Sequence, residues 1–254
     1  MSAAVLWRKK IYEGRRVQDI QGITGLHGIA FLEIAEIANT MLKTKRWQMN
    51  GRDSWGRTPL MWAVEYKKRG MVELFLKQED IEPDTAIGNG RTVFSFAAEL
   101  EDEEAVKLLL ERGDVNPNST DSNGRTPLSF AAERGNEGIV KLLGERRDVG
   151  FDTPDVNGRT PLTFAAGRGQ IGVVKLLLER EDVDSNSSDK NGRTLLSFAA
   201  GGLPNPASLW GRFFRGPRRG VIQLLLQQKD VDPNSCDNNG RTPSDGHDQI
   251  MIDQ

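Results

Sequence analysis

The sequence has little cysteine and no long apolar run. Among its 254 residues there is one cysteine, Cys236, so no intrachain disulfide can form, which favours a reducing compartment. No apolar stretch approaches the roughly 20 residues that a membrane-spanning helix needs, and the basic N-terminal residues lack the apolar core of a signal peptide. A net charge of −2 gives no bulk attraction to nucleic acid or membranes. We therefore expect a cytoplasmic or nuclear protein without a membrane partner.

The sequence does contain a long internal repeat. The tripeptide Gly-Arg-Thr begins at residues 56, 90, 124, 158 and 192, with a constant spacing of 34, and returns at 240. Gly22-Ile23-Thr24 lies 34 residues before the first copy. A fixed period of this length indicates a solenoid, in which stacked copies bury one another's apolar faces.

One copy, residues 124–157, shows the local structure that we expect of all. Thr126 is a good helix N-cap and Pro127 suits the first helical position. An apolar stretch with two alanines follows, and Gly135 suits a left-handed end to this short helix. A second apolar stretch predicts a longer helix. The copy ends in Asn157-Gly158, which predicts a two-residue hairpin turn.

The Thr-Pro-Leu start, the Ala-Ala pair and the Val-x-Leu-Leu-Leu second helix resemble the ankyrin repeat. A period of 34 also suits the tetratricopeptide class, but that class has a Trp/Gly/Tyr pattern and no hairpin finger between units. The resemblance covers residues 22–243 and is most similar to arrays in large fungal proteins, which often follow a NACHT-type nucleotide-binding module. It implies an all-α solenoid of helix-turn-helix units with β-hairpin fingers.

The repeat sets the expected domain boundaries. An N-terminal extension, 1–21, precedes an ankyrin repeat domain, 22–243, and a C-terminal tail, 244–254, follows it. We expect about six repeats and a truncated stub that begins at residue 240 and has no second helix, so the last repeat should fray unless more protein covers it. The repeats are 22–55, 56–89, 90–123, 124–157, 158–191 and 192–239.

Two departures from the pattern carry predictions. The glycine between the helices is replaced by Glu33, Lys67 and Glu101 in the first three repeats, and we expect other caps there at a cost of about 1 kcal/mol each. The last two copies of Gly-Arg-Thr are 48 residues apart, which places 14 extra residues near 203–216, between the helices of the sixth repeat.

The stretch GGLPNPASLWGRFFRGPRRG at 201–220 holds this insertion. A disordered loop or a coding accident is the preferred interpretation, because loop length is tolerated there. A partner-binding loop that uses Trp210, Phe213 and Phe214 is the second. Nucleic-acid binding through its aromatic and arginine residues is the third, and the net charge makes it unlikely.

No combination of residues predicts catalysis, a cofactor or a metal site. The string from Gly167 to Gly172 fits G-x-G-x-x-G, but it follows a helix and matches an inter-helix turn in the previous repeat. A calcium loop around Gly124 would need a glutamate where Phe130 stands. In Thr-Gly-Leu-His, His27 resembles the family's structural histidine, which forms hydrogen bonds between repeats. Cys236 has no basic neighbour and should be inert.

Charged residues that recur in every copy should be structural. We expect the arginine of Gly-Arg-Thr to pair with acids across the hairpins. We also expect a structural role for the aspartate that recurs at one loop position. Its copies are Asp114, Asp148, Asp182 and Asp230.

The resemblance implies that partners bind a concave surface made by the first helices and finger tips. Function should lie where repeats differ on that face, and the first two repeats carry more aromatics. We predict a partner-binding patch of Trp55, Met61 and Tyr66, with Trp62 in the core. The predicted function is a monomeric, non-enzymatic protein-interaction scaffold. The alternatives are the recognition arm of a larger NACHT-type protein and an adaptor for ubiquitin transfer or transcription.

Overall fold

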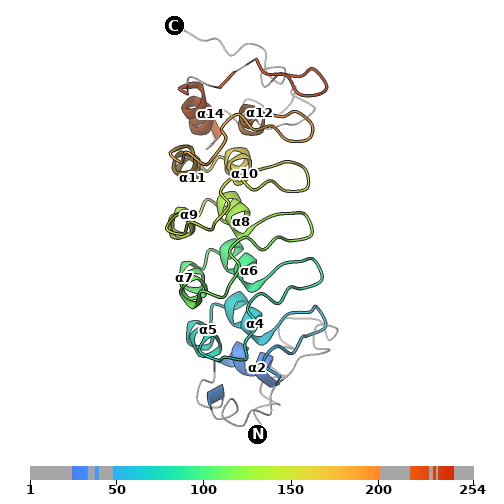
Figure 1. Cartoon of the computed structure of the whole chain (residues 1–254), viewed down its shortest axis with the longest axis vertical. Coiled ribbons are helices and arrows are strands. Elements are labelled where there is room, and N and C mark those ends of the chain that lie inside the picture. Colours follow the sequence, from blue (N-terminus) through green and yellow to red (C-terminus); the bar gives the residue numbers. More distant parts are fainter. Residues whose placement is uncertain are drawn as a thin grey trace. The chain divides into compact units, whose positions relative to one another are not determined.

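A computed structural model describes residues 25–33, 38–39, 48–200, 218–228, 231–232 and 234–242. The chain divides into two compact units, 1–122 and 123–254, and each is described by itself. The predicted N-terminal extension and C-terminal tail lie outside the described residues. Within the described residues every regular element is a helix, and the fold is an all-α ankyrin-repeat solenoid (Figure 1).

The first unit stacks helices in two layers. One layer holds α2 (Gly25–Leu32), α4 (Pro59–Glu65) and α6 (Val93–Glu99), and the other holds α5 (Arg69–Leu76) and α7 (Glu103–Arg112). Helix α4 packs against both α2 and α6, while α5 packs against α7. The core between these layers consists of fully buried apolar side chains, among them Leu60, Phe75, Phe94 and Leu109.

The second unit repeats this arrangement. Helices α8 (Pro127–Arg134), α10 (Pro161–Arg168) and α12 (Leu195–Ala200) form one layer. Helices α9 (Glu137–Gly144), α11 (Ile171–Leu178) and α14 (Arg218–Leu226) form the other. Each first helix packs on its neighbour and on its own second helix, with buried leucine and valine side chains between them.

Threonine hydroxyls start the first helices as the sequence predicts. Thr58 accepts a hydrogen bond from the Met61 N–H, Thr126 from the Ser129 N–H and Thr160 from the Thr163 N–H. Each pairing satisfies one backbone donor that the first helical turn leaves open. A proline follows each of these threonines.

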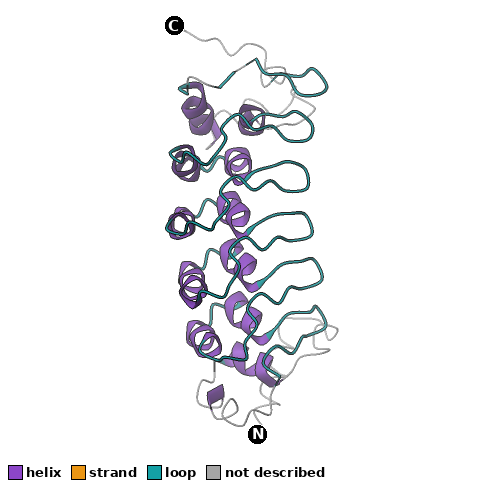
Figure 2. Cartoon of the chain, viewed as in Figure 1, coloured by secondary structure: helices purple, strands orange, loops and turns teal. Residues whose placement is uncertain are grey.

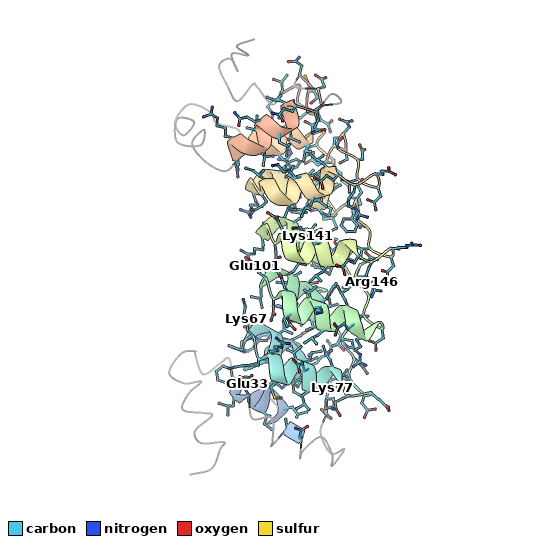
Figure 3. The ribbon with its side chains drawn as sticks, turned by 90° about the vertical axis from the view of Figure 1, so that its left-hand side faces the viewer. Glu33, Lys67, Lys77, Glu101, Lys141 and Arg146 are labelled. Carbon is cyan, nitrogen blue, oxygen red and sulfur yellow. The ribbon has the colours of Figure 1, made fainter. Side chains whose placement is uncertain are left out.

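The inter-helix turns of the first unit correct one expectation. Glu33, Lys67 and Glu101, which are labelled in Figure 3, do not use another cap. They adopt the left-handed backbone, with φ of 55°, 51° and 58°. The next residue forms the same backbone bond in both units, from Lys68 N to Ala63 O at 2.7 Å and from Asn136 N to Ala131 O at 3.0 Å. That backbone bond requires left-handed geometry at the preceding turn residue, whether or not the turn residue is glycine.

The fingers between repeats correct a second expectation. The Asn-Gly pairs do not form two-residue hairpin turns, which need a positive φ at both residues. Among the described residues no asparagine has a positive φ, whereas Gly158 has a φ of 83°. Gly158 N donates to Asp155 O at 2.9 Å, and Asp155 N donates to Arg159 O at 2.9 Å. These bonds define a three-residue loop that ends in a left-handed glycine.

The fingers contain no regular strand in the described part of the chain (Figure 2). Neighbouring fingers within a unit are instead joined by a single backbone hydrogen bond. The bond runs from Val156 N to Asn123 O at 2.8 Å, and from Lys190 N to Asn157 O at 2.8 Å. The fingers approach so closely that a Cβ on Gly124 would lie 3.0 Å from Val156 N.

Candidate protein-interaction surface

A buried aspartate organises the finger that precedes α4. Asp53 Oδ1 accepts from the backbone N–H groups of Trp55 and Arg57, at 2.9 and 2.8 Å. Its Oδ2 accepts from Arg57 Nε and Trp62 Nε1, each at 2.9 Å. Burial by itself would raise the pKa of Asp53, but the hydrogen bonds from Trp62 and Arg57 outweigh it and lower the pKa. The carboxylate therefore stays charged and holds the finger and helix together.

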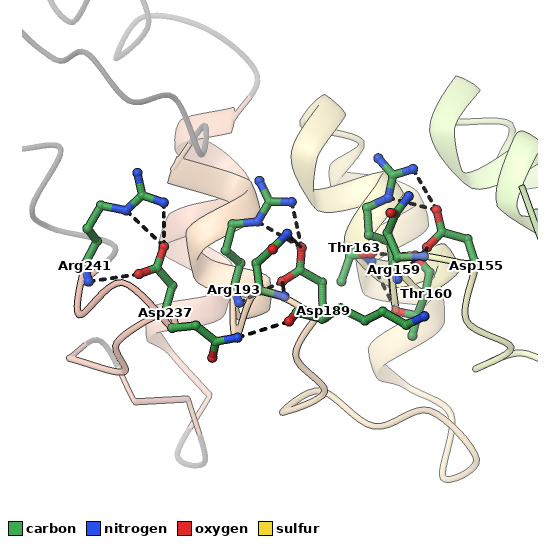
Figure 4. Close-up of polar contacts among 12 residues, drawn as sticks. Asp155, Arg159, Thr160, Thr163, Asp189, Arg193, Asp237 and Arg241 are labelled. Carbon is green, nitrogen blue, oxygen red and sulfur yellow. Dashed lines mark hydrogen bonds and ion pairs between the residues drawn. The ribbon is translucent and has the colours of Figure 1, made fainter.

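The fingers of the second unit contain the same Asp–Arg pair. Asp155, Asp189 and Asp237 each accept backbone and side-chain hydrogen bonds from the arginine four residues later (Figure 4). For Asp237 these bonds lower the pKa to about 2, and those from the Arg241 backbone contribute most. The expected pairing of the repeated arginine is therefore present, and its partner is an aspartate within the same finger.

Arg159 and Arg193 also lie over aromatic rings. The guanidinium carbon of Arg159 is 4.7 Å from the Phe164 ring centroid, and Arg193 lies at the same distance over Phe198. The finger that precedes α6 has Ile87 where the other fingers have aspartate, and there Arg91 pairs with Glu99 and covers Phe96. The repeated arginine is thus part of the scaffold rather than a freely solvated charge.

Trp55 is the feature that distinguishes the second-repeat finger. Its side chain is 41% exposed, although it is a large aromatic. The guanidinium of Arg57 lies between two indole rings, 4.5 Å from the Trp55 centroid and 4.9 Å from the Trp62 centroid. Arg57 is itself held by Asp53 and by Glu65. Trp55 is therefore presented to solvent by a fixed support.

Tyr66 belongs to an aromatic cluster beside this finger. Its ring packs edge-on against Phe31, with centroids 4.7 Å apart, and tilted against Trp62 at 5.5 Å. Tyr66 is half-buried, so part of its ring remains accessible. Trp62 is buried, as predicted for a core residue, and so is its equivalent Phe130. The equivalents Phe96, Phe164 and Phe198 are half-buried beneath their arginines.

Met61 does not belong to the surface. It is 1% exposed, because its side chain points into the core between α4 and the neighbouring helices. The prediction that Met61 contacts a partner is therefore wrong. Its equivalents Ser95, Ser129, Thr163 and Ser197 are also buried, so the difference between repeats at this position concerns core packing.

The insertion aromatics Trp210, Phe213 and Phe214 lie outside the described residues. The structure does show α12 ending at Ala200 and α14 beginning at Arg218, on either side of this segment.

His27 occupies the structural role that the resemblance implies. It is fully buried, its Nε2 lies 2.8 Å from the Arg57 carbonyl oxygen, and its ring packs edge-on against Trp62. Burial lowers the pKa of His27, so the ring is neutral at physiological pH. It thereby links α2 to the next finger.

The other candidates for chemistry have scaffold environments. Asp114, Asp148 and Asp182 pair with the arginine two residues earlier, at the end of each second helix. Cys236 is exposed, and its Sγ lies 3.6 Å from the Asn234 carbonyl oxygen. In the part of the chain that the structure describes, no three acidic, histidine or cysteine side chains gather to hold a metal ion. None of the helices described there is long and apolar enough to cross a bilayer.

Comparisons with known proteins agree with this geometry. The family model for three ankyrin repeats matches residues 72–153 and 145–205, and the single-repeat model matches 55–86. The structure is similar to the ankyrin repeat domain of Bcl-3, a member of the IkappaB protein family. The two superpose with a TM-score of 0.70 at 22% identity, over 90% of this chain and 96% of that one.

A second similar structure is the ankyrin repeat protein EF0377, with a TM-score of 0.67 at 22% identity, over 80% of this chain and 97% of that one. No curated protein sequence matches the chain. Ankyrin repeats form non-catalytic scaffolds that generally mediate protein–protein interaction. From the repeat network and these matches, the chain belongs to the ankyrin repeat family.

Proposed function

We propose that this chain is a non-enzymatic scaffold that binds a protein partner through Trp55 and Tyr66. The observation that carries the proposal is the 41% exposure of Trp55 on a fixed finger. Exposed tryptophan and tyrosine side chains on rigid supports are frequent anchors of protein interfaces, because they bury much area at a small cost in conformational entropy. The five later fingers carry asparagine at the Trp55 position, namely Asn89, Asn123, Asn157, Asn191 and Asn239.

The repeat supplies the test variant. Trp55→Asn places in this finger the residue that its equivalents carry, so the turn is preserved while the indole is lost. Tagged wild-type chain is used to capture partners from the source cells, and the purified partner is titrated against wild-type and variant protein. We expect the variant to weaken binding by about 2 kcal/mol, roughly 30-fold.

Val156→Asn is the matched control, because Val156 is an exposed apolar residue on a finger of the second unit. This control should retain wild-type affinity. Wild-type affinity for Trp55→Asn, or an equal loss in both variants, would overturn the proposed patch.

The biological setting is part of the same proposal. The likeness of the repeats to fungal NACHT-associated arrays supports a role as the recognition arm of a larger signalling protein, and the single cysteine supports a cytoplasmic or nuclear location. A transcript that encodes a phosphate-loop domain in frame upstream would support the role as a recognition arm. Microscopy of a fluorescent fusion tests the location, and secretion of the fusion would contradict it.

A further inference from the structure

The acid that accompanies the repeated arginine is lost part of the way along the sequence. Glu65, Glu99 and Glu133 occupy one position of the first helix in repeats two to four, and the fifth and sixth repeats have Gly167 and Gly201 there. Where the glutamate is present it meets the arginine of its own finger. Arg57 Nη1 lies 2.6 Å from Glu65 Oε2, and Arg125 Nη1 lies 3.7 Å from Glu133 Oε2.

Gly167 leaves the corresponding edge of Arg159 open. The hydrogen bonds of Arg159 run from Nε and Nη2 to Asp155 Oδ2, at 2.9 and 2.7 Å. Its Nη1 has no hydrogen-bond partner among the described residues, and the side chain is 31% exposed, compared with 11% for Arg57. The contacts of Arg193 repeat this arrangement, with Nε and Nη2 on Asp189 Oδ2 at 2.9 and 2.6 Å (Figure 4).

The second unit carries further cations besides these two arginines. Arg168 is 61% exposed and pairs with Glu133, and Lys190 is exposed on the next finger. Arg218 is close enough to Arg168 that its pKa is lowered, first by burial and then by the charge of Arg168. The aspartates that face these groups, Asp155 and Asp189, are buried beneath their arginines. The aspartate that pairs with each arginine is therefore covered, whereas part of each arginine remains exposed.

We propose that Arg159 and Arg193 bind side-chain carboxylates of an acidic segment of a partner protein, each at the Nη1 edge that Glu65 occupies on Arg57. This proposal rests on the proposed function in one respect, namely that the chain binds a protein partner. Arg159 and Arg193 are not part of the proposed patch of Trp55 and Tyr66. Each guanidinium is held by an aspartate and a phenylalanine ring, so little conformational entropy is lost on binding.

The surroundings favour a carboxylate over nucleic acid. The chain itself shows a carboxylate on this edge in the second repeat. Single-stranded nucleic acid binds where exposed aromatic rings stack on bases beside the cations, and here Phe164 and Phe198 are covered by the arginines themselves.

The test restores the missing acid. Gly167→Glu in the full chain should place a carboxylate against Arg159 and compete with any external one. A Cβ at Gly167 meets nothing closer than 3.8 Å, and the residue lies inside α10, so the substitution fits the fold. The uncharged isostere Gly167→Gln is the matched variant. Asn186→Asp, in an exposed loop, controls for the added negative charge.

The probe is a fluorescein-labelled deca-glutamate peptide, titrated by fluorescence anisotropy at low salt. We expect wild type, Gly167→Gln and Asn186→Asp to bind alike and Gly167→Glu to bind about fivefold more weakly. No binding by wild type, or equal binding by Gly167→Glu and Gly167→Gln, overturns the proposal.

Two more measurements separate the alternatives. Tighter binding of a thymidine oligomer of equal charge, with the same loss in Gly167→Glu, overturns the proposal in favour of nucleic acid. Trp55→Asn should leave the peptide affinity unchanged, so failure of the Trp55 patch and failure of this surface are distinguished.

Discussion

The finger that precedes α4 and the finger that precedes α10 share one network and present different surfaces. In both, a buried aspartate holds the arginine four residues later, and that arginine covers an aromatic ring. At the first finger, Trp55 of the finger and Glu65 of α4 cover the guanidinium and leave an exposed aromatic surface. The second has Asn157 and Gly167 at these positions, which leaves part of the guanidinium exposed.

The comparison shows which positions carry stability and which carry recognition. Residues that recur in most copies bond inside the scaffold, as Asp155 and Arg159 do. Residues that change between copies, such as Trp55 and Gly167, alter the surface and leave the backbone of the finger unchanged. The following predictions test this division.

The largest effect should follow loss of the shared aspartate. Asp155→Ala removes the acceptor of the Asn157 and Arg159 backbone N–H groups and leaves the Arg159 guanidinium uncompensated. We expect a loss of about 3 kcal/mol in the free energy of unfolding, measured by urea denaturation. The exposed Asp148, changed to alanine, should give no measurable loss.

A second substitution sharpens this result. The finger that precedes α6 tolerates Ile87 because Glu99 compensates Arg91. Adding Gly167→Glu to Asp155→Ala should therefore recover part of the lost stability. If the double variant is no more stable than Asp155→Ala, the two acids do not share the arginine.

Next comes a pH effect confined to the first unit. Burial lowers the pKa of His27 below its ordinary value of 6.5, so protonation favours the unfolded state. The stability contributed by His27 is fully present above pH 6.5, the ordinary pKa of histidine. It is lost as the pH falls from 6.5 through the lower pKa that His27 has in the folded protein. Protection from hydrogen exchange, corrected for the intrinsic pH dependence of amide exchange, should fall in α2 and α4 over this range and remain steady in α10. His27→Gln should remove the difference, and an equal loss of protection in α10 would contradict it.

A smaller gain should come from the inter-helix turns, which hold non-glycine residues in the first unit and glycines in the second. Lys67→Gly relieves a φ of 51°, and its exposed side chain should contribute few contacts. We expect a gain of about 1 kcal/mol in unfolding free energy. The reverse change, Gly135→Ala at a φ of 82°, should cost more than this, because its Cβ would also displace the Gln170 side chain. Loss of stability in Lys67→Gly would show that the lysine makes stabilising contacts.

The smallest effect on stability should be that of Trp55→Asn. Five other fingers carry asparagine at this position, so the unfolding free energy should change by less than about 0.5 kcal/mol. Thermal denaturation of wild type and variant measures it. A large loss would make Trp55 a structural residue and break the division between stability and recognition.

The 34-residue period and the Thr-Pro pairs at the starts of the first helices predict the fold, because they determine the local structure of each repeat. Thr126 caps its helix and Gly135 ends it, as expected from the sequence alone. The helix repeat also places Trp62 in the core.

The remaining features of the fold and the site depend on contacts between residues that the spacing of the repeats does not reveal. Asp53 and its equivalents are not identified from the sequence as the partners of the repeated arginine, although an aspartate stands four residues before every copy of this arginine except Arg91. Met61 looked like a surface residue because it differs between repeats, yet the helix face on which it lies is buried. The left-handed turns at Glu33, Lys67 and Glu101 follow from the need to form the bond that closes each first helix, which outweighs residue preference.

The single backbone bond between neighbouring fingers has a consequence for how such a chain can change over time. Asn238 N lies 2.8 Å from Asn191 O, the distance that joins Val156 to Asn123, although the sixth repeat carries 14 more residues between the two fingers. The bond therefore depends on how the copies stack and not on the length of chain between them. A gene built this way can gain, lose or lengthen a copy by unequal recombination while the adjoining copies keep their structure.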